Sequence, residues 1–98
     1  MKNNIKNKYN HKELLDTLGV TLDQLQSSVR TQRLSDARAM FAAALMQQAG
    51  MSQQKVARIL HTTQPGVSLM LKRHECLLVY PHYRALWFRV ESLELRVV

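Results

Sequence analysis

The spacing of apolar residues along the chain predicts helices rather than strands. The clearest helix covers residues 34–49, where the stretch AMFAAALM (39–46) is apolar on every side and rich in alanine, leucine and methionine. These are the best helix formers among apolar residues. Because a helix without a polar face must be surrounded by other elements, we expect residues 34–49 to form a buried central helix that ends at Gly50.

Shorter helices are expected before and after the central one. Thr21 and Gln24 are spaced as a capping box, which begins a helix at about residue 22. Ser52 is a good N-cap residue, and Pro81 suits the first turn of a last helix. The predicted helices cover residues 11–18, 22–28, 34–49, 52–60, 64–78 and 81–95. In the last of these, the apolar residues that can return to the core are Leu86, Trp87, Val90 and Leu93.

The segments between these helices are short. Residues 1–10 have no apolar periodicity, and we expect a flexible basic tail there. The segment VRTQR (29–33) carries two arginines and is expected to be a basic loop. A chain of 98 residues is long enough for one domain with a single modest core. The prediction is therefore an all-α domain of five or six helices over residues 11–98.

The composition excludes several classes of protein. With 46% hydrophobic residues and few glycines and prolines, the chain should fold rather than stay disordered. No apolar run approaches the length that spans a bilayer, and the polar N-terminus is not a secretory signal. The single cysteine, Cys76, cannot form an internal disulfide. We therefore expect a cytoplasmic protein without a membrane partner.

The positive charge is concentrated in the middle of the chain. Of the net charge of +7, residues 24–74 carry +6, because seven basic residues there accompany Asp36 alone. These basic residues are Arg30, Arg33, Arg38, Lys55, Arg58, Lys72 and Arg73. A polyanion such as DNA is the natural partner of this segment, although a solvated basic face that aids solubility would have the same composition.

The basic segment also contains the pattern of a helix-turn-helix, which we assign to residues 52–74. The string HTTQPGVSLMLKRHE (61–75) begins a second helix directly after a shorter one. Ala57 supplies the small residue that is needed where the two helices cross, and we expect Val67 to pack there. His61 stands where the turn usually holds a glycine, and histidine adopts a positive φ more readily than most other residues.

The start of the second motif helix carries the candidates for base recognition. Only the first turn and one face of such a helix can reach base edges in the major groove. The residues at these positions are Thr63, Gln64, Pro65, Ser68 and Leu69. The Gln64 amide can bond N6 and N7 of one adenine together, and Leu69 can touch a thymine methyl group.

Basic residues elsewhere in the motif are candidates for contacts to the DNA backbone. Lys72 and Arg73 lie further along the second helix, where they would reach phosphates. Lys55, on the first helix, is either a phosphate contact or an ordinary exposed residue. The lysine-rich tail over residues 1–10 could be a further arm that touches DNA.

Part of the motif resembles a known family. The stretch SQQKVARILHTTQPGVS (52–68) is similar to the helix-turn-helix of lambdoid phage repressors and Cro-like proteins. The resemblance implies that Gln53, which opens the first helix, clamps a backbone phosphate. It also implies that Gln64, which opens the second helix, reads a base.

A second resemblance covers more of the chain. It is carried by LGVTLDQL (18–25), RTQRLSDARAMFAAAL (30–45), GMSQQKVARIL (50–60) and LKRHECLL (71–78). These segments resemble the C-terminal DNA-binding domain of the bacterial replication initiator DnaA, whose fold is related to the Trp repressor. The resemblance implies binding of double-stranded DNA, with the recognition helix in the major groove and an arginine of the basic loop in the minor groove. Arg30 and Arg33 occupy that loop, and Arg38 matches a family arginine in the long helix. All three are therefore candidates for contacts to the DNA backbone or the minor groove.

The sequence departs from the initiator family at the start of the recognition helix. The family has an acidic-His-Thr signature there, whereas this chain has Thr63, Gln64, Pro65 and Gly66. The chain also lacks a phosphate-binding glycine loop, so it is not the ATP-dependent initiator itself.

The sequence does not indicate metal or catalytic chemistry. The candidate metal ligands do not have zinc-finger spacing and are expected to be structural: His11, His61, His74, His82 and Cys76. Cys76 has no evident base beside it that would make it a nucleophile. Trp87 and Phe88 could begin a homodimer contact or return to the core. We expect a DNA-binding protein without a cofactor, most simply a transcriptional regulator. The alternatives are an origin-type accessory factor and a protein-interaction module that has kept the fold and lost DNA binding.

Overall fold

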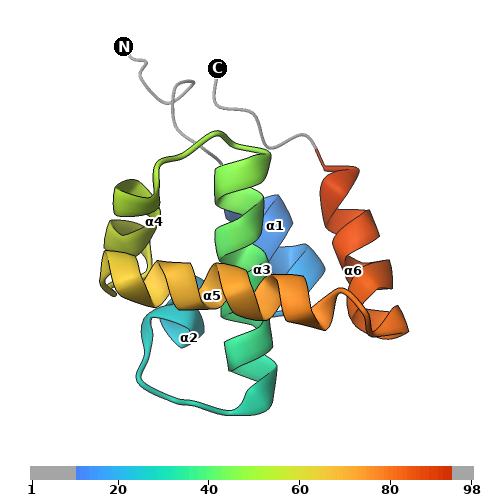
Figure 1. The fold of residues 1–98 in the computed structure, drawn as a ribbon, viewed down its shortest axis with the longest axis horizontal. Helices are drawn as coiled ribbons and strands as arrows, with labels where there is room; N and C mark the ends of the chain where they lie inside the picture. The colour runs from blue at the N-terminus through green and yellow to red at the C-terminus, as the bar shows by residue number, and fades with distance from the viewer. Residues whose placement is uncertain (1–10, 94–98) are drawn as a thin grey trace.

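The computed structural model describes residues 11–93, and these form six helices and no strand (Figure 1). The helices are α1 (His11–Leu18), α2 (Leu22–Gln26), α3 (Gln32–Gln47), α4 (Gln53–Ile59), α5 (Gln64–Leu77) and α6 (Pro81–Glu91). The all-α prediction is therefore confirmed. The predicted tail over residues 1–10 and the predicted end of the last helix at residue 95 lie outside the described residues.

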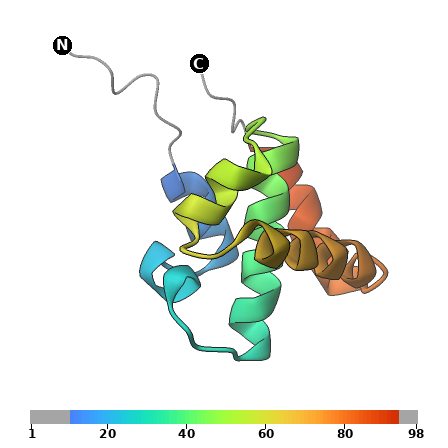
Figure 2. The same cartoon turned by 60° about the vertical axis from the view of Figure 1, so that its left-hand side comes forward.

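Helix α3 is the central element of the molecule and contacts each of the other five helices. Figures 1 and 2 show α5 crossing over α3, with α4 and α6 on either side. Every side chain from Ala39 to Leu45 is fully buried, as the uniformly apolar stretch predicted. The helix begins two residues earlier than expected, because the side chain of Thr31 accepts a hydrogen bond from the backbone N–H of Leu34 and caps it. Arg33 therefore belongs to the first turn of α3 and not to a loop.

The ends of the short helices follow the local signals in the sequence. Thr21 and Gln24 form the predicted capping box at the start of α2. Gly19 and Gly50 follow the ends of α1 and α3 with φ of 72° and 71°, in the left-handed region that only glycine enters freely. These residues fix where each helix stops and so set the entry of the chain into α2 and α4.

Helix α6 is held against the C-terminal half of α5 by a buried aromatic cluster. His74 is 1% exposed, its Nδ1 lies 2.8 Å from the Tyr83 hydroxyl, and its ring centroid lies 4.4 Å from that of Trp87. Burial lowers the pKa of His74 and raises the pKa of Tyr83 well above its usual value. The phenol therefore stays protonated and shares a hydrogen bond with the imidazole. His74 thus packs as part of the core between α5 and α6. Trp87 lies in the core, whereas Phe88 is 75% exposed.

Candidate nucleic-acid interface

Helices α4 and α5 are joined by a short connection over residues 60–63, and each begins with a side-chain cap. Ser52 accepts a hydrogen bond from the N–H of Lys55, and Thr63 accepts one from the N–H of Gly66. His61 has φ of 55°, so it adopts the left-handed conformation that the sequence assigned to the turn. The turn closes when the N–H of Thr62 donates to the carbonyl of Ala57, over 2.9 Å.

The two helices pack through the residues that the sequence placed between them. Ala57 and Val67 are both buried, and Val56 and Leu60 extend the same apolar contact on α4. An alanine at the crossing lets the helix axes approach, and this approach fixes the direction in which α5 leaves the turn. In the first turn of α5, Gln64 and Pro65 are exposed, while Val67 packs into the core.

A polar bridge also holds α5 against α4. The side-chain nitrogen of Gln53 donates to the carbonyl of Gln64 over 2.8 Å and to the hydroxyl of Ser68. Both N–H groups of the Gln53 amide thus donate to acceptors within the protein, and only its oxygen is available to a partner. A phosphate accepts hydrogen bonds and cannot donate them, so Gln53 would have to give up part of this bridge to clamp one. We therefore assign Gln53 first to positioning α5.

The leading end of α5 is accessible to a partner. Thr63, Gln64 and Pro65 are exposed, and Leu69, one turn further on, is 67% exposed. The structure records no hydrogen bond of the Gln64 side chain to any residue between 11 and 93, so its amide is presented with its donors and acceptor open. Ser68 is half-buried, and its hydroxyl accepts the bond from Gln53.

Gly66 is required by its neighbour in the turn. A Cβ at this position would lie 2.5 Å from Oγ1 of Thr62 and 3.3 Å from Oγ1 of Thr63, which is the N-cap of the helix. The absence of a side chain therefore lets the turn fold back closely on the start of α5. The packing of Thr62 thus supplies a reason for glycine at this position.

Arg38 does not lie where a backbone contact would require it, and we correct its assignment. The residue is 7% exposed, and its guanidinium donates to three carbonyls at the C-terminal end of α2. These carbonyls belong to Gln24, Leu25 and Ser27. A cation at a helix C-terminus satisfies carbonyl groups that have no partner within the helix. Arg38 therefore stabilises α2 and the loop that follows it.

The other arginines and lysines of the prediction are exposed or partly exposed. Arg33 is exposed, and its guanidinium donates to the carbonyl of Gly19 at the end of α1. Arg73 is held by Asp36, with Nε and Nη2 lying 2.9 and 2.8 Å from the same carboxylate oxygen. The residues with no recorded ion pair or hydrogen bond from their side chains, within the range that the structure describes, are Arg30, Lys55 and Lys72.

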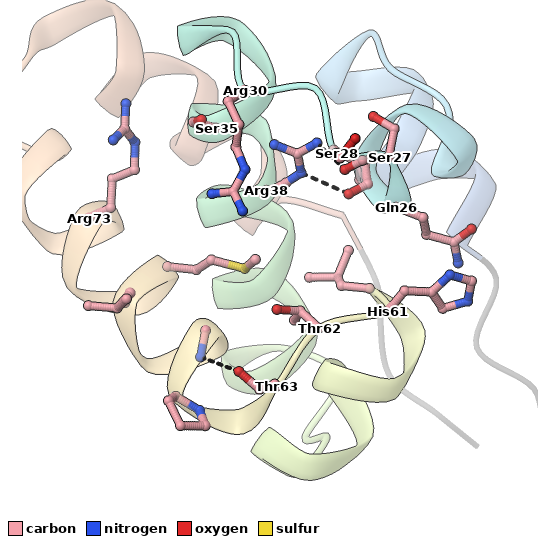
Figure 3. A pocket seen from close by; sticks show the side chains of 16 residues that line it. Gln26, Ser27, Ser28, Arg30, Ser35, Arg38, His61, Thr62, Thr63 and Arg73 are labelled. Atoms are coloured by element: carbon pink, nitrogen blue, oxygen red, sulfur yellow. Dashed lines mark hydrogen bonds between the residues drawn. The ribbon is translucent and has the colours of Figure 1, made fainter.

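A cavity of about 640 Å³ lies between the first turns of α5 and the loop after α2 (Figure 3). Arg30, Arg38 and Arg73 line it together with hydroxyl groups of the loop and the turn. Burial, and secondly the nearby charge of Arg30, lower the pKa of Arg38. Of the predicted site residues, the cavity brings together Thr63, Pro65, Leu69, Arg30, Arg38 and Arg73. Gln53 and Ser68 belong to the bridge instead, and Lys55 and Lys72 line neither.

Sequence reasoning missed the polar residues that shape this cavity. Ser27, Ser28 and Thr62 line it, and Gln26 fastens α2 to α4 by donating to the carbonyl of Ile59 over 2.7 Å. These residues lie in or beside short connections and carry no periodic signal. Only the folding of α2 against α4 makes them neighbours.

Within residues 11–93, the structure has no helix of the length and apolar character that a bilayer span requires, and no cluster of three or more His, Cys, Asp or Glu side chains suited to a metal ion. No protein-family model, curated protein or solved structure matches this chain.

Proposed function

We propose that this protein binds double-stranded DNA through a helix-turn-helix formed by α4 and α5, with the N-terminal end of α5 in the major groove. The observation that carries the proposal is the Gln64 side chain, which is exposed in the first turn of α5 and has no recorded hydrogen bond within residues 11–93. A glutamine amide can donate to N7 and accept from N6 of the same adenine only if its helix is held at a fixed angle. The Gln53 bridge provides this support.

The charge around α5 supports a nucleic acid as the partner. Arg30 and Lys72 extend from the loop before α3 and from the middle of α5 without carboxylate partners among the described residues. Such side chains neutralise phosphates and release counterions, which makes binding strong at low salt and independent of sequence. Base readout by Gln64, together with Leu69, would add the sequence-specific part.

The proposed biological role is that of a transcriptional regulator in the cytoplasm. An origin-type accessory factor would use the same interface, and the resemblance to the initiator's C-terminal domain keeps that role as a prediction. The two roles differ in where the bound sequence lies in the genome. Selection of bound sequences from random duplexes at a stated salt concentration would identify that sequence.

The test of the interface is the pair Gln64→Ala and Gln54→Ala, measured on the selected duplex and on a scrambled one. Gln54 is an exposed glutamine on α4 and serves as the matched control. We expect Gln64→Ala to weaken binding to the selected site by roughly 1–3 kcal/mol and to relax the choice at one base pair. Binding to the scrambled duplex should barely change, because the basic residues set it.

Two results would contradict the proposal. Gln64→Ala could leave the base preference intact, which would remove α5 from base recognition. The unaltered protein could also fail to bind any duplex at low salt, in which case the fold serves as a protein-interaction module.

A further inference from the structure

The cavity beside α5 has the dimensions of a site for a small organic ligand. Its volume of about 640 Å³ lies within the range of roughly 300–1,000 Å³ that such sites occupy. One wall is the start of α5, through Pro65 and Leu69, and the opposite wall is the loop after α2, through Ser28 and Arg30. The walls thus come from segments that are distant in sequence.

The cavity is lined by positively charged side chains, and among residues 11–93 no acidic side chain in its lining balances them. Arg73 is neutralised by Asp36, which lies outside the cavity lining, but Arg30 and Arg38 have no carboxylate partner in the described chain. Figure 3 shows Arg30 and Arg38 among the residues that line the cavity, and the charge of Arg30 is near enough to lower the pKa of Arg38. Two adjacent cations without an anion favour the binding of one.

The geometry of Arg38 favours a small ligand over the backbone of a duplex. Its Nε and Nη2 atoms are bound to backbone carbonyls, whereas no hydrogen bond within residues 11–93 is recorded for Nη1. The residue is 7% exposed and lines the cavity, so a molecule bound in the cavity can reach this remaining donor.

The uncharged residues of the lining indicate what the rest of the ligand should be. Leu25, Leu60 and Met70 supply an apolar surface, while Ser27, Ser35 and Thr62 supply hydroxyl groups. An inorganic ion would leave the apolar surface uncovered. A ligand that joins an anionic group to an apolar or aromatic body would use both parts of the lining.

We propose that this cavity binds a small organic anion whose phosphate or carboxylate group lies between Arg30 and Arg38 and whose apolar body lies against Leu60 and Met70. If the proposed DNA interface is correct, on which this second step rests, the ligand also changes affinity for DNA. Pro65 and Leu69 belong to both the cavity wall and the proposed base-reading end of α5. An occupied cavity would therefore alter the surface that a duplex meets.

Binding is tested first without DNA, by titrating the ¹⁵N-labelled full chain with phenyl phosphate, benzoate and inorganic phosphate. We expect saturable shifts of backbone amide signals at residues 27–30, 62–64 and 66. Phenyl phosphate should bind about tenfold or more tightly than inorganic phosphate, because only its ring covers the apolar surface. Benzoate distinguishes a carboxylate site from one that requires phosphate.

The variant Arg30→Met removes one cation of the pair and keeps the length of the side chain. It should weaken phenyl phosphate binding by about tenfold, corresponding to one lost charge-assisted hydrogen bond. Lys55→Met, at an exposed cation outside the cavity, is the matched control and should leave binding unchanged. The proposal is overturned by shifts that do not saturate, by shifts spread over all basic side chains, or by equal losses in the two variants.

A second measurement separates this site from the proposed function. A labelled duplex is titrated with the protein in the presence and absence of saturating phenyl phosphate, and the two dissociation constants are compared. Saturable ligand binding without any duplex binding would support the cavity and remove the proposed function. Duplex binding without saturable ligand binding would overturn the cavity and leave the DNA interface in place. Equal duplex affinities with the cavity occupied would overturn the coupling alone.

Discussion

Replacing Arg38 by methionine tests whether this arginine stabilises the fold or contacts DNA. Methionine keeps most of the apolar stem, so the change mainly removes the guanidinium and its three hydrogen bonds. The carbonyl of Gln24 would still accept hydrogen bonds from the backbone N–H and the hydroxyl of Ser27. The carbonyls of Leu25 and Ser27 would lose the donor that the arginine provides.

The expected loss of stability follows from these two carbonyls. A buried acceptor without a partner costs about 1–3 kcal/mol, and water that enters the adjacent cavity would recover part of this cost. Removal of a desolvated charge offsets a further part. We therefore expect a net loss of about 2 kcal/mol. For a domain of this size, such a loss lowers the melting temperature by roughly 8–16 °C.

The assay is thermal and urea unfolding followed by circular dichroism, with Arg33→Met as the control. Arg33 is exposed and makes one hydrogen bond, to the carbonyl of Gly19, so its replacement should cost less than about 1 kcal/mol. In duplex binding below the melting temperature, Arg38→Met should leave the salt dependence unchanged. A phosphate contact would instead reduce the slope by about 0.9. A melting temperature within a few degrees of the unaltered protein, or a reduced slope, would refute the structural assignment.

Three further predictions concern single positions. Burial lowers the pKa of His74, so the unfolded chain takes up a proton near pH 6.5 while the folded one does not. The contribution of neutral His74 to the free energy of unfolding should therefore be fully present above about pH 6.5. It should decrease as the pH is lowered below this value. Urea titrations at pH 5 and pH 7.5 measure this decrease. In His74→Phe the decrease should be smaller, because the contribution of His74 is removed. The contribution of His11, whose pKa burial also lowers, should remain. His61→Gly should raise stability by about 0.5–1 kcal/mol, because glycine adopts a φ of 55° without strain, and no gain would argue against strain in the turn. Replacing a glycine by alanine within a helix usually raises stability by about 1 kcal/mol. Gly66→Ala should not show this increase, because the new methyl group would lie too close to Thr62. The full increase in thermal unfolding would show that Thr62 moves aside without cost.

Much of the fold could be predicted from the sequence because its signals are local. The starts of α2 to α6 are each marked by a capping side chain or a proline within a few residues, as Thr21, Ser52 and Pro81 illustrate. The buried character of α3 follows from the composition of a single stretch of chain. The positive φ of His61 could also be expected from its place in the turn. The predicted start of α3 was two residues too late, because the sequence pattern did not identify Thr31 as its N-cap.

The candidate site depended more on tertiary structure, because the same residue type has different roles in different surroundings. Arg30 and Arg38 are both basic residues of the middle segment, but one is exposed and the other is buried against the end of α2. Gln53 and Gln64 are both helix-opening glutamines, but the first bridges to α5 while the second faces outward. The sequence by itself determined the helices, the site of the turn and the excess of positive charge, since these depend on residues close together in the chain. Which cations converge on a cavity and which satisfy carbonyls depends on contacts between α2, α3 and α5, and only the packing of these helices decides it.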